Sequence, residues 1–277
     1  MTAADPARLA ALLADCRAIA QAAGEEIMAV YRTAFSVDHK ADRSPLTEAD
    51  LRAHRLIAAR LAELTPHWPL LSEEGADLPY AERRQWRTYW LVDPLDGTRE
   101  FVKRNDEFTV NIALVHDHEP VLGVVHAPAL GRMCYAARGV GAFQRRDGGE
   151  AQPLACRELP AGELVVAGSR SHGKAALAAF MERLGPHQVI PMGSSLKFCL
   201  VAEGRADLYP RLGPTSEWDT AAAQCVVETA GGHVTDLDMR PLRYNTRDSL
   251  LNPCFFAFGR TWRDWSALLP EPRPDAC

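Results

Sequence analysis

The pattern of short apolar runs changes at residues 145–160, and this change constrains the fold more than any other feature of the sequence. Before it, runs at residues 108–115 and 121–126 are separated by a polar His-Asp-His-Glu-Pro turn, which predicts an antiparallel hairpin. After it, expected strands alternate with expected helices, as in α/β folds. The segment itself contains Asp, Gly and Pro residues, which favour loops. We therefore predict a boundary near residue 150, between an antiparallel-rich α+β domain (residues 1–150) and an α/β domain (residues 151–277).

Local sequence signals predict the individual helices and strands. Asp5 and Pro6 form a helix cap and first-turn pair, and apolar residues then recur at helical spacing as far as Tyr31. A second helix is expected from Thr47 to about Leu64. Further strands are expected at residues 69–72, 89–92, 164–167, 188–191 and 206–209, and further helices at residues 172–184, 194–202 and 218–230.

The composition narrows the class of protein. Apolar residues make up 47% of the 277 positions, which is enough to bury a core. Acidic side chains outnumber basic ones by 36 to 31, and this balance argues against a nucleic-acid-binding surface, which needs clustered Lys and Arg. The seven cysteines have no CxxC spacing, so we expect buried thiols in a reducing compartment. Lacking a signal peptide or a run of about 18 apolar residues, the chain is expected to be cytoplasmic and without a transmembrane segment.

The most informative motif is Trp-Leu-Val-Asp-Pro-Leu-Asp-Gly-Thr at residues 90–98. An apolar strand is expected to end at Asp93, and Asp96 follows after a proline turn, so two carboxylates and a carbonyl can converge on one point. Such hard oxygen ligands suit Mg²⁺ or Mn²⁺ rather than zinc. Taken alone, however, an ordinary Asp-Pro turn with a capping Asp explains the motif better.

Other acidic residues occupy matching positions at the ends of expected elements. Glu73 and Glu74 follow the expected strand at residues 69–72, and Asp219 opens an expected helix. Three such sites in one chain predict a shared metal centre, in which two divalent ions about 4 Å apart could activate a water and neutralise a leaving oxygen. A fourth motif contains Thr47 and Asp50, whose spacing is typical of a helix capping box. The spacing alone does not separate this structural role from a catalytic one.

The order and spacing of these motifs resemble those of a known family. Ser-Pro-Leu-Thr-Glu-Ala-Asp, Leu-Ser-Glu-Glu, Asp-Pro-Leu-Asp-Gly-Thr and Trp-Asp-Thr-Ala-Ala are similar to the motifs of the lithium-sensitive, magnesium-dependent phosphatases of the inositol monophosphatase superfamily. Within it, the chain most resembles the bacterial 3′(2′),5′-bisphosphate nucleotidases of the CysQ type. The stretches at residues 40–45, 96–105, 107–114 and 193–204 carry this closer likeness, and residues 209–215 and 251–253 extend it.

The resemblance implies a fold, a cofactor and a set of metal ligands. The implied fold is the layered αβαβα sandwich of the inositol monophosphatase and fructose-1,6-bisphosphatase type, with the metal site in the cleft between the two parts. The implied cofactor is Mg²⁺, as two or three ions, with Mn²⁺ as a substitute. The implied ligands are Glu73, Asp93, the Leu95 carbonyl, Asp96 and Asp219.

The resemblance also implies catalytic and substrate-binding residues. Thr98, oriented by Asp50, would align the attacking water, and Glu74 would lie just outside the metal ligands. Two loops that each follow an expected strand would meet the nucleotide, although each loop alone is explained slightly better as a plain helix cap, with Ser171 and Ser194 as the caps. The implied substrate-binding set is Arg170, His172, Ser194 and Lys197, together with Glu73, Leu95, Asp96, Gly97, Thr98 and Asp219.

The resemblance also implies a reaction, which belongs to sulfate assimilation and the turnover of adenosine 3′,5′-bisphosphate. The enzyme is expected to hydrolyse the 3′-phosphate of this small nucleotide to give AMP and phosphate, and also to act on its sulfated analogue PAPS. The rivals are an inositol or sugar phosphatase with the same metal site and a non-catalytic nucleotide-binding regulator. A covalent aspartyl phosphatase is disfavoured, because its two aspartates lie two positions apart whereas Asp93 and Asp96 lie three apart.

The sequence leaves assembly and membrane contact open. It does not distinguish a monomer from a homodimer, and it does not fix the number of ions bound at rest. The resemblance implies that some family members associate with the cytoplasmic face of the inner membrane. Nothing in these residues supplies a lipid anchor or a basic helix for such contact.

Overall fold

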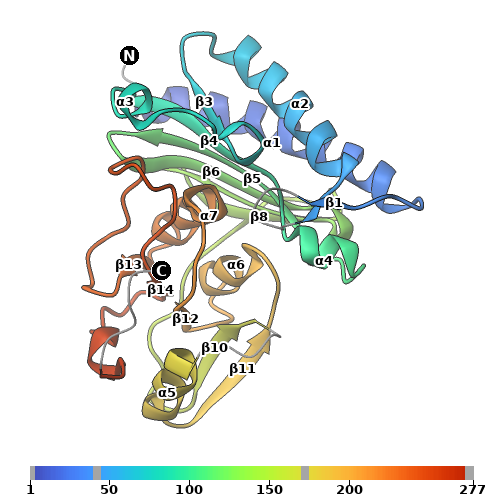
Figure 1. The fold of residues 1–277 in the computed structure, drawn as a ribbon. Helices are drawn as coiled ribbons and strands as arrows, with labels where there is room; N and C mark the ends of the chain where they lie inside the picture. The colour runs from blue at the N-terminus through green and yellow to red at the C-terminus, as the bar shows by residue number, and fades with distance from the viewer. Residues whose placement is uncertain (1–3, 40–44, 170–174, 272–277) are drawn as a thin grey trace.

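The computed structural model describes residues 4–39, 45–169 and 175–271, and these form five stacked layers (Figure 1). Helices α1 (Pro6–Tyr31) and α2 (Glu48–Leu64) cover the outer face of a seven-stranded sheet. Helices α6 (Leu196–Ala202) and α7 (Glu217–Thr229) lie between this sheet and a five-stranded sheet. Helix α5 (Ala175–Leu184) packs on the far side of the second sheet. The predicted αβαβα sandwich is therefore confirmed.

The two outer helices begin where the sequence predicts. The Asp5 side chain accepts a hydrogen bond from the Ala7 backbone N–H, and Thr47 caps α2 through a complete capping box. Both helices bury one apolar face against the first sheet, in a core that includes Leu9, Ile27 and, on the sheet, Ile112. Just before α2, the short strands β1 (Asp38–His39) and β2 (Pro45–Leu46) pair antiparallel.

The seven-stranded sheet has its strands in chain order, and every neighbouring pair is antiparallel except β3 with β4. The predicted hairpin is confirmed as β5–β6. Strands β7, β8 and β9 were not predicted, and the segment expected to be a loop contains the end of β8 and all of β9. The strands are β3 (Leu70–Ser72), β4 (Thr88–Asp96), β5 (Thr109–His116), β6 (Glu119–Ala127), β7 (Arg132–Ala137), β8 (Gly141–Arg146) and β9 (Gln152–Pro153).

The five-stranded sheet has the order β11-β10-β12-β14-β13. Strands β10, β11 and β12 run parallel, as an α/β pattern predicts, whereas β14 runs antiparallel to both β12 and β13. The second part is therefore mixed rather than purely alternating. Its strands are β10 (Leu164–Gly168), β11 (His187–Pro191), β12 (Leu208–Arg211), β13 (His233–Asp236) and β14 (Phe255–Phe258). The short helices of the chain are η1 (Glu73–Gly75), α3 (Tyr80–Arg83), α4 (Thr98–Val102), η2 (Pro128–Leu130) and η3 (Trp265–Leu268).

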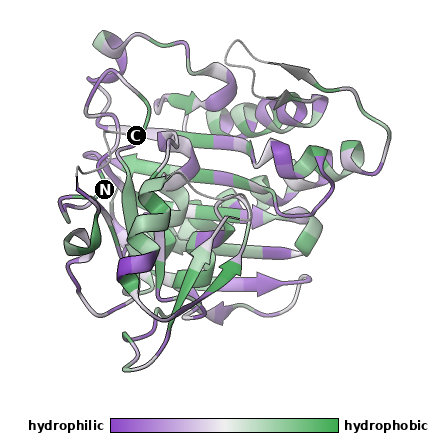
Figure 2. Cartoon of the chain, turned by 60° about the horizontal axis from the view of Figure 1, so that its bottom comes forward, coloured by the Kyte–Doolittle hydropathy of each residue, from purple (hydrophilic) through white to green (hydrophobic). Residues whose placement is uncertain are grey.

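Helix α7 joins the two parts, because it belongs to the second half of the chain but packs on strands β4 to β7 of the first sheet. Its buried face is built of small residues, Ala221 to Ala223, which let the helix backbone approach the sheet closely. Figure 2 shows the apolar stretches in the strands at the centre of the molecule. The domain boundary near residue 150 stays a prediction, and the core between the two sheets is continuous.

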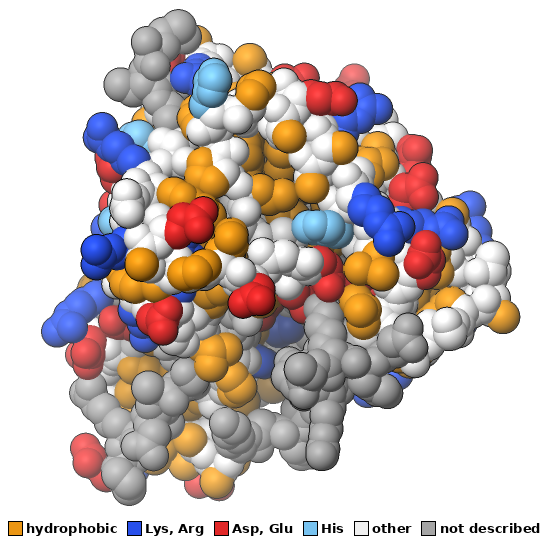
Figure 3. Space-filling view, turned by 45° about the horizontal axis from the view of Figure 1, so that its top comes forward, with side chains coloured by type: hydrophobic (Ala, Val, Ile, Leu, Met, Phe, Trp, Pro, Cys, Tyr) orange, Lys and Arg blue, Asp and Glu red, His pale blue; other side chains and the backbone are white. Residues whose placement is uncertain are grey.

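Surface charges are mixed in sign, and most cysteines are buried. On the face seen in Figure 3, basic and acidic side chains are interspersed. Five of the seven cysteines are free and buried, in agreement with the expectation of buried thiols: Cys16, Cys134, Cys156, Cys199 and Cys225. Cys254 departs from that expectation because it is disulfide-bonded. No helix within the described ranges is long and apolar enough to cross a membrane.

The contact between α7 and β6 depends on Gly123. A Cβ atom at this position would lie 2.1 Å from the carbonyl oxygen of Ala222 on α7. We expect Gly123→Ala to lower the free energy of unfolding by about 3 kcal/mol, because the helix must move off the sheet. Urea unfolding measures this change. Gly162→Ala is the matched control, since a Cβ there meets nothing within 4 Å; equal stability of the two variants would contradict the prediction.

Candidate metal centre and adjoining cavity

The first two acids of the site lie at the end of β4, where the strand is irregular. The sequence predicts that this strand ends at Asp93, but β4 continues to Asp96, with a shift of register against β5 between these residues. Pro94 lies inside the irregular stretch, where its missing N–H costs no ladder hydrogen bond. In a regular strand, residues three apart point to opposite faces. The irregularity allows Asp93 and Asp96 to converge.

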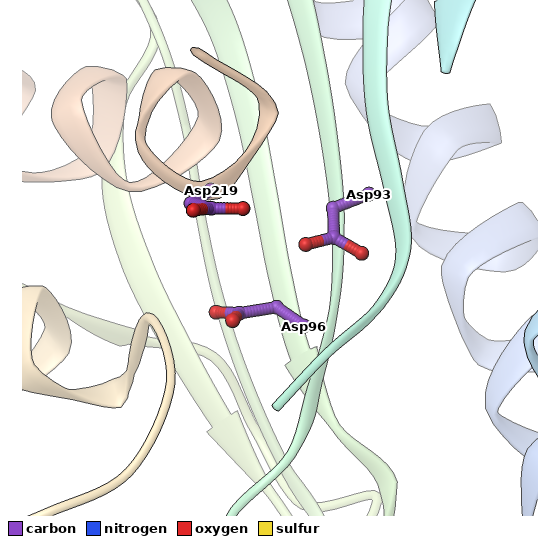
Figure 4. A group of neighbouring side chains, drawn as sticks. All are labelled: Asp93, Asp96 and Asp219. Atoms are coloured by element: carbon purple, nitrogen blue, oxygen red, sulfur yellow. The ribbon is translucent and has the colours of Figure 1, made fainter. Parts of the chain in front are cut away.

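Asp219 approaches the same point from the first turn of α7. The helix is capped by Ser216, and the Asp219 carboxylate accepts a hydrogen bond of 2.8 Å from the Ser216 backbone N–H. Asp93, Asp96 and Asp219 each offer a carboxylate oxygen, and these atoms all lie within 4.8 Å of one another. Figure 4 shows the three side chains pointing toward one another from β4 and α7. Folding thus brings together three predicted ligands that are far apart in the chain.

Burial and mutual repulsion favour the protonated forms of Asp93 and Asp219. Burial first, and then the neighbouring charge of Asp96, raise the pKa of Asp219 to about 8. Burial and the charges of Glu73, Asp96 and Asp219 raise the pKa of Asp93 well above its usual range. A compact set of carboxylate oxygens that repel one another matches the donor set of hard divalent cations. The residues present therefore fit a metal ion.

Two further predicted residues lie beside the cluster because β3 runs parallel to β4. Ser72 on β3 pairs with Val92, so η1 begins with Glu73 next to Asp93. The charge of Glu73 contributes to the raised pKa of Asp93, so the two carboxylates lie close together. Glu74 lies close enough to Asp50 for its charge to raise the pKa of that carboxyl. The roles assigned to both glutamates stay predictions.

Asp50 serves as both a helix cap and a partner of Thr98. One oxygen of its carboxylate accepts hydrogen bonds from the Thr47 backbone N–H and hydroxyl, and the other lies 3.3 Å from the Thr98 hydroxyl. The same hydroxyl lies 3.3 Å from the Leu95 carbonyl oxygen. Burial raises the pKa of Asp50 to about 6, although the Thr47 hydrogen bonds act against this shift. The capping box is thus present, and the geometry also allows the predicted pairing with Thr98.

A cavity of about 910 Å³ extends from the acids toward the second sheet. Five predicted site residues line it, namely Asp96, Gly97, Ser194, Lys197 and Asp219. The basic side chains in its lining are Arg99, Lys103, Lys197 and Arg211, and apolar ones include Val166, Leu177, Met181 and Val189. Arg170 and His172 lie outside the described residues, although the adjacent Ser169 lines the cavity.

Arg211 was missed in the sequence, although a signal for it existed. It ends β12, which runs parallel to β10, so it reaches the same sheet edge as the predicted loop after Gly168. Its charge lowers the pKa of Asp219, which places it near the cluster. A basic residue directly after a parallel strand could have been assigned to the site on this ground.

The loop before α6 differs from the expected helix cap. Ser194 was predicted to cap the helix, but α6 starts one residue later, after Ser195. Ser194 has a φ of 41°, and its hydroxyl donates to the Glu107 carbonyl instead. The Lys197 ammonium donates to the Ser194 carbonyl at 2.7 Å, and burial lowers the pKa of Lys197 to about 8. The loop is therefore held by its contacts with the first part of the chain rather than by a local cap.

The fold and the acid cluster together define a metal-dependent enzyme with a layered αβαβα architecture. The model of the Inositol monophosphatase family matches residues 9–268. The chain belongs to this family, whose members are metal-dependent.

Within this family, the chain is similar to several bisphosphate nucleotidases among the proteins compared. The chain is 51% identical over 240 residues to the 3′(2′),5′-bisphosphate nucleotidase CysQ of Escherichia coli O157:H7, covering 86% of this chain and 95% of that protein. It is 37% identical to the corresponding protein of Haemophilus influenzae over 90% of this chain and 93% of that protein. The crystal structure of CysQ from Bacteroides thetaiotaomicron, 41% identical, matches 91% of this chain and 98% of its own with a TM-score of 0.81. An inositol monophosphatase of Thermotoga maritima matches less closely, with 27% identity and a TM-score of 0.72 over 88% of this chain and 89% of its own.

Metal affinity should depend on pH through the raised pKa values of the cluster. A cation must displace the protons that Asp93 and Asp219 retain, so binding releases protons and strengthens as pH rises toward about 8. Calorimetric titration of the chelator-treated protein with Mg²⁺ at several pH values measures both quantities. Asp219→Asn should weaken binding and flatten its pH dependence. An affinity that is constant between about pH 6 and pH 8 would contradict this expectation.

Proposed function

We infer that this chain is a metal-dependent phosphatase that acts as a 3′(2′),5′-bisphosphate nucleotidase. It removes the 3′-phosphate of adenosine 3′,5′-bisphosphate to give AMP and phosphate, and we propose PAPS as a second substrate. The observation that carries this assignment is the cluster of Asp93, Asp96 and Asp219 beside a cavity whose lining includes four basic side chains. Identity of about half the residues with CysQ nucleotidases along nearly their full length supports it. The cytoplasmic location stays a prediction.

We propose that the cofactor is Mg²⁺, as two or three ions, with Mn²⁺ as a substitute. Bound at this cluster, such a cation would lower the pKa of a coordinated water and neutralise charge on the phosphate. The oxygen-only donor set and the protons it retains support this choice. The proposed ligands are Glu73, Asp93, the Leu95 carbonyl, Asp96 and Asp219.

We propose that Thr98 and Asp50 orient the attacking water. The Thr98 hydroxyl has a single hydrogen, and when it donates this hydrogen to the Asp50 carboxylate its lone pairs are available to accept one from a water. The two hydrogen bonds from Thr47 fix the Asp50 carboxylate and hence the Thr98 hydroxyl. Hydrolysis of phosphate monoesters has a very high uncatalysed barrier, so alignment of this kind must contribute much of the acceleration.

The size and lining of the cavity favour a nucleotide over an inositol phosphate. Its volume of about 910 Å³ is at the upper end of the range for ligand pockets, and a single inositol ring would leave much of it unfilled. We propose that Lys197 and Arg211, which line the cavity, meet the phosphate that is not hydrolysed. We propose that the apolar side chains of Leu177 and Met181 offer a surface for the base.

Substrate preference tests the proposed function directly. We expect kcat/KM for adenosine 3′,5′-bisphosphate to exceed that for inositol 1-phosphate by about 100-fold or more under the same Mg²⁺ concentration, because the smaller substrate leaves polar groups of the cavity unpaired. Phosphate release measured in parallel on both substrates decides the question. A preference for inositol 1-phosphate would assign the chain to the inositol phosphatase branch, and turnover of neither would favour a non-catalytic regulator.

The role of Thr98 can be separated from a structural one by its substitutions. We expect Thr98→Ala to lower kcat about 10²-fold to 10⁴-fold, because the water loses its orienting group, with little change in KM. Thr98→Ser keeps the hydroxyl and should retain most of the activity. Steady-state rates, together with rapid quenching to look for a phosphoenzyme, make the measurement. Full activity of Thr98→Ala, or a trapped phosphoenzyme, would overturn the direct-water mechanism.

A further inference from the structure

We propose that Ser195 is a positioning residue for Asp96, acting together with Asn111 to fix the Asp96 carboxylate for a divalent cation. The inference rests on the proposed metal centre but not on the identity of the substrate. Neither residue was among the predicted site residues. Both are almost completely buried, Ser195 with 2% and Asn111 with 1% of their surface exposed.

Ser195 holds one oxygen of Asp96 with two donors. Its backbone N–H lies 2.6 Å and its hydroxyl 2.7 Å from Asp96 Oδ2. Because both bonds go to Oδ2, the other carboxylate oxygen takes part in neither. The carboxylate is thus anchored through one oxygen, which leaves the second available as a ligand.

The hydroxyl of Ser195 also joins the two parts of the chain. It lies 2.8 Å from the Asp219 carbonyl oxygen, and it accepts a hydrogen bond of 2.8 Å from Asn111 Nδ2. A serine hydroxyl has one hydrogen and two lone pairs. Since the Asn111 amide can only donate at this nitrogen, the Ser195 hydrogen remains free to go to Asp96 or to the Asp219 carbonyl. Ser195 therefore connects β4, β5, α6 and α7 at the metal centre.

The helix cap does not account for this geometry. Ser195 occupies the cap position of α6, yet its side chain makes no capping hydrogen bond to the helix. The hydroxyl is instead directed at two residues that also contribute to the acid cluster, Asp96 and Asp219. Groups that orient metal ligands in this way typically change metal affinity by 10-fold to 100-fold when they are removed.

The experiment measures metal binding rather than turnover alone. The purified full-length protein is freed of metal with a chelator and titrated calorimetrically with Mn²⁺. We expect Ser195→Ala to raise the Kd for Mn²⁺ by about 10-fold to 100-fold. Asn111→Ala should have a smaller effect of the same sign, because Asn111 donates to the Ser195 hydroxyl at 2.8 Å and reaches Asp96 Oδ2 itself only at 3.5 Å. The double variant should be less than additive, since most of the Asn111 contribution passes through that hydroxyl. Ser249→Ala, an exposed serine in a loop, is the matched control and should bind Mn²⁺ like the parent protein.

Turnover then separates positioning from catalysis. In Ser195→Ala, saturating Mn²⁺ should restore most of kcat, because the defect lies in cation affinity. Ser195→Cys, which keeps the size and a weaker donor, should lie between the parent and the alanine variant, and it serves if Ser195→Ala does not fold. An unchanged Kd for Mn²⁺ in both variants, additive effects in the double variant, or no Mn²⁺ binding by the parent protein would overturn the proposal. Failure of the parent to hydrolyse adenosine 3′,5′-bisphosphate while it still binds Mn²⁺ would instead count only against the proposed substrate.

Discussion

The repulsion among three closely spaced carboxylates is the constraint on which the rest of the site depends. Asp93 is buried and Asp96 and Asp219 are partly buried, and their oxygens lie within 4.8 Å of one another, where like charges repel. The fold answers this repulsion with one backbone N–H for each acid, from Leu95, Ser195 and Ser216 respectively. Each of these donors fixes one oxygen, while protons or a cation must neutralise the remaining charge.

The packing of the layers brings the three acids and their backbone N–H donors together. The irregularity in β4 turns Asp96 toward Asp93, and the small residues of α7 let Asp219 approach from the opposite layer. Gly123 permits this approach, since it leaves room for the α7 backbone against the first sheet. The proposed metal centre therefore depends on the packing between layers. The adjoining cavity extends from it toward the second sheet.

In the proposed reaction, the acid cluster would bind the cation and the cavity would bind the rest of the substrate. The acids and Thr98 are contributed mostly by the first half of the chain, in which the relevant elements follow one another closely. Lys197 and Arg211 come from the second half and line the larger, partly apolar space. In the proposed reaction, these two basic residues of the second half would therefore help to select the substrate.

The sequence by itself determined the elements whose signals are local. Asp5 and Thr47 mark helix starts because their side chains cap the backbone within a few residues, and the carboxylate motifs stand out because they follow apolar runs. Only the tertiary structure decided the pairing of β13 with β14, the continuation of β4 past Pro94, and the contact of Ser195 with Asp96. Ser195 and Asp96 are 99 residues apart, and a hydrogen bond across that distance leaves no pattern in the local sequence. Such contacts depend on how the layers pack, and packing is a property of the whole chain.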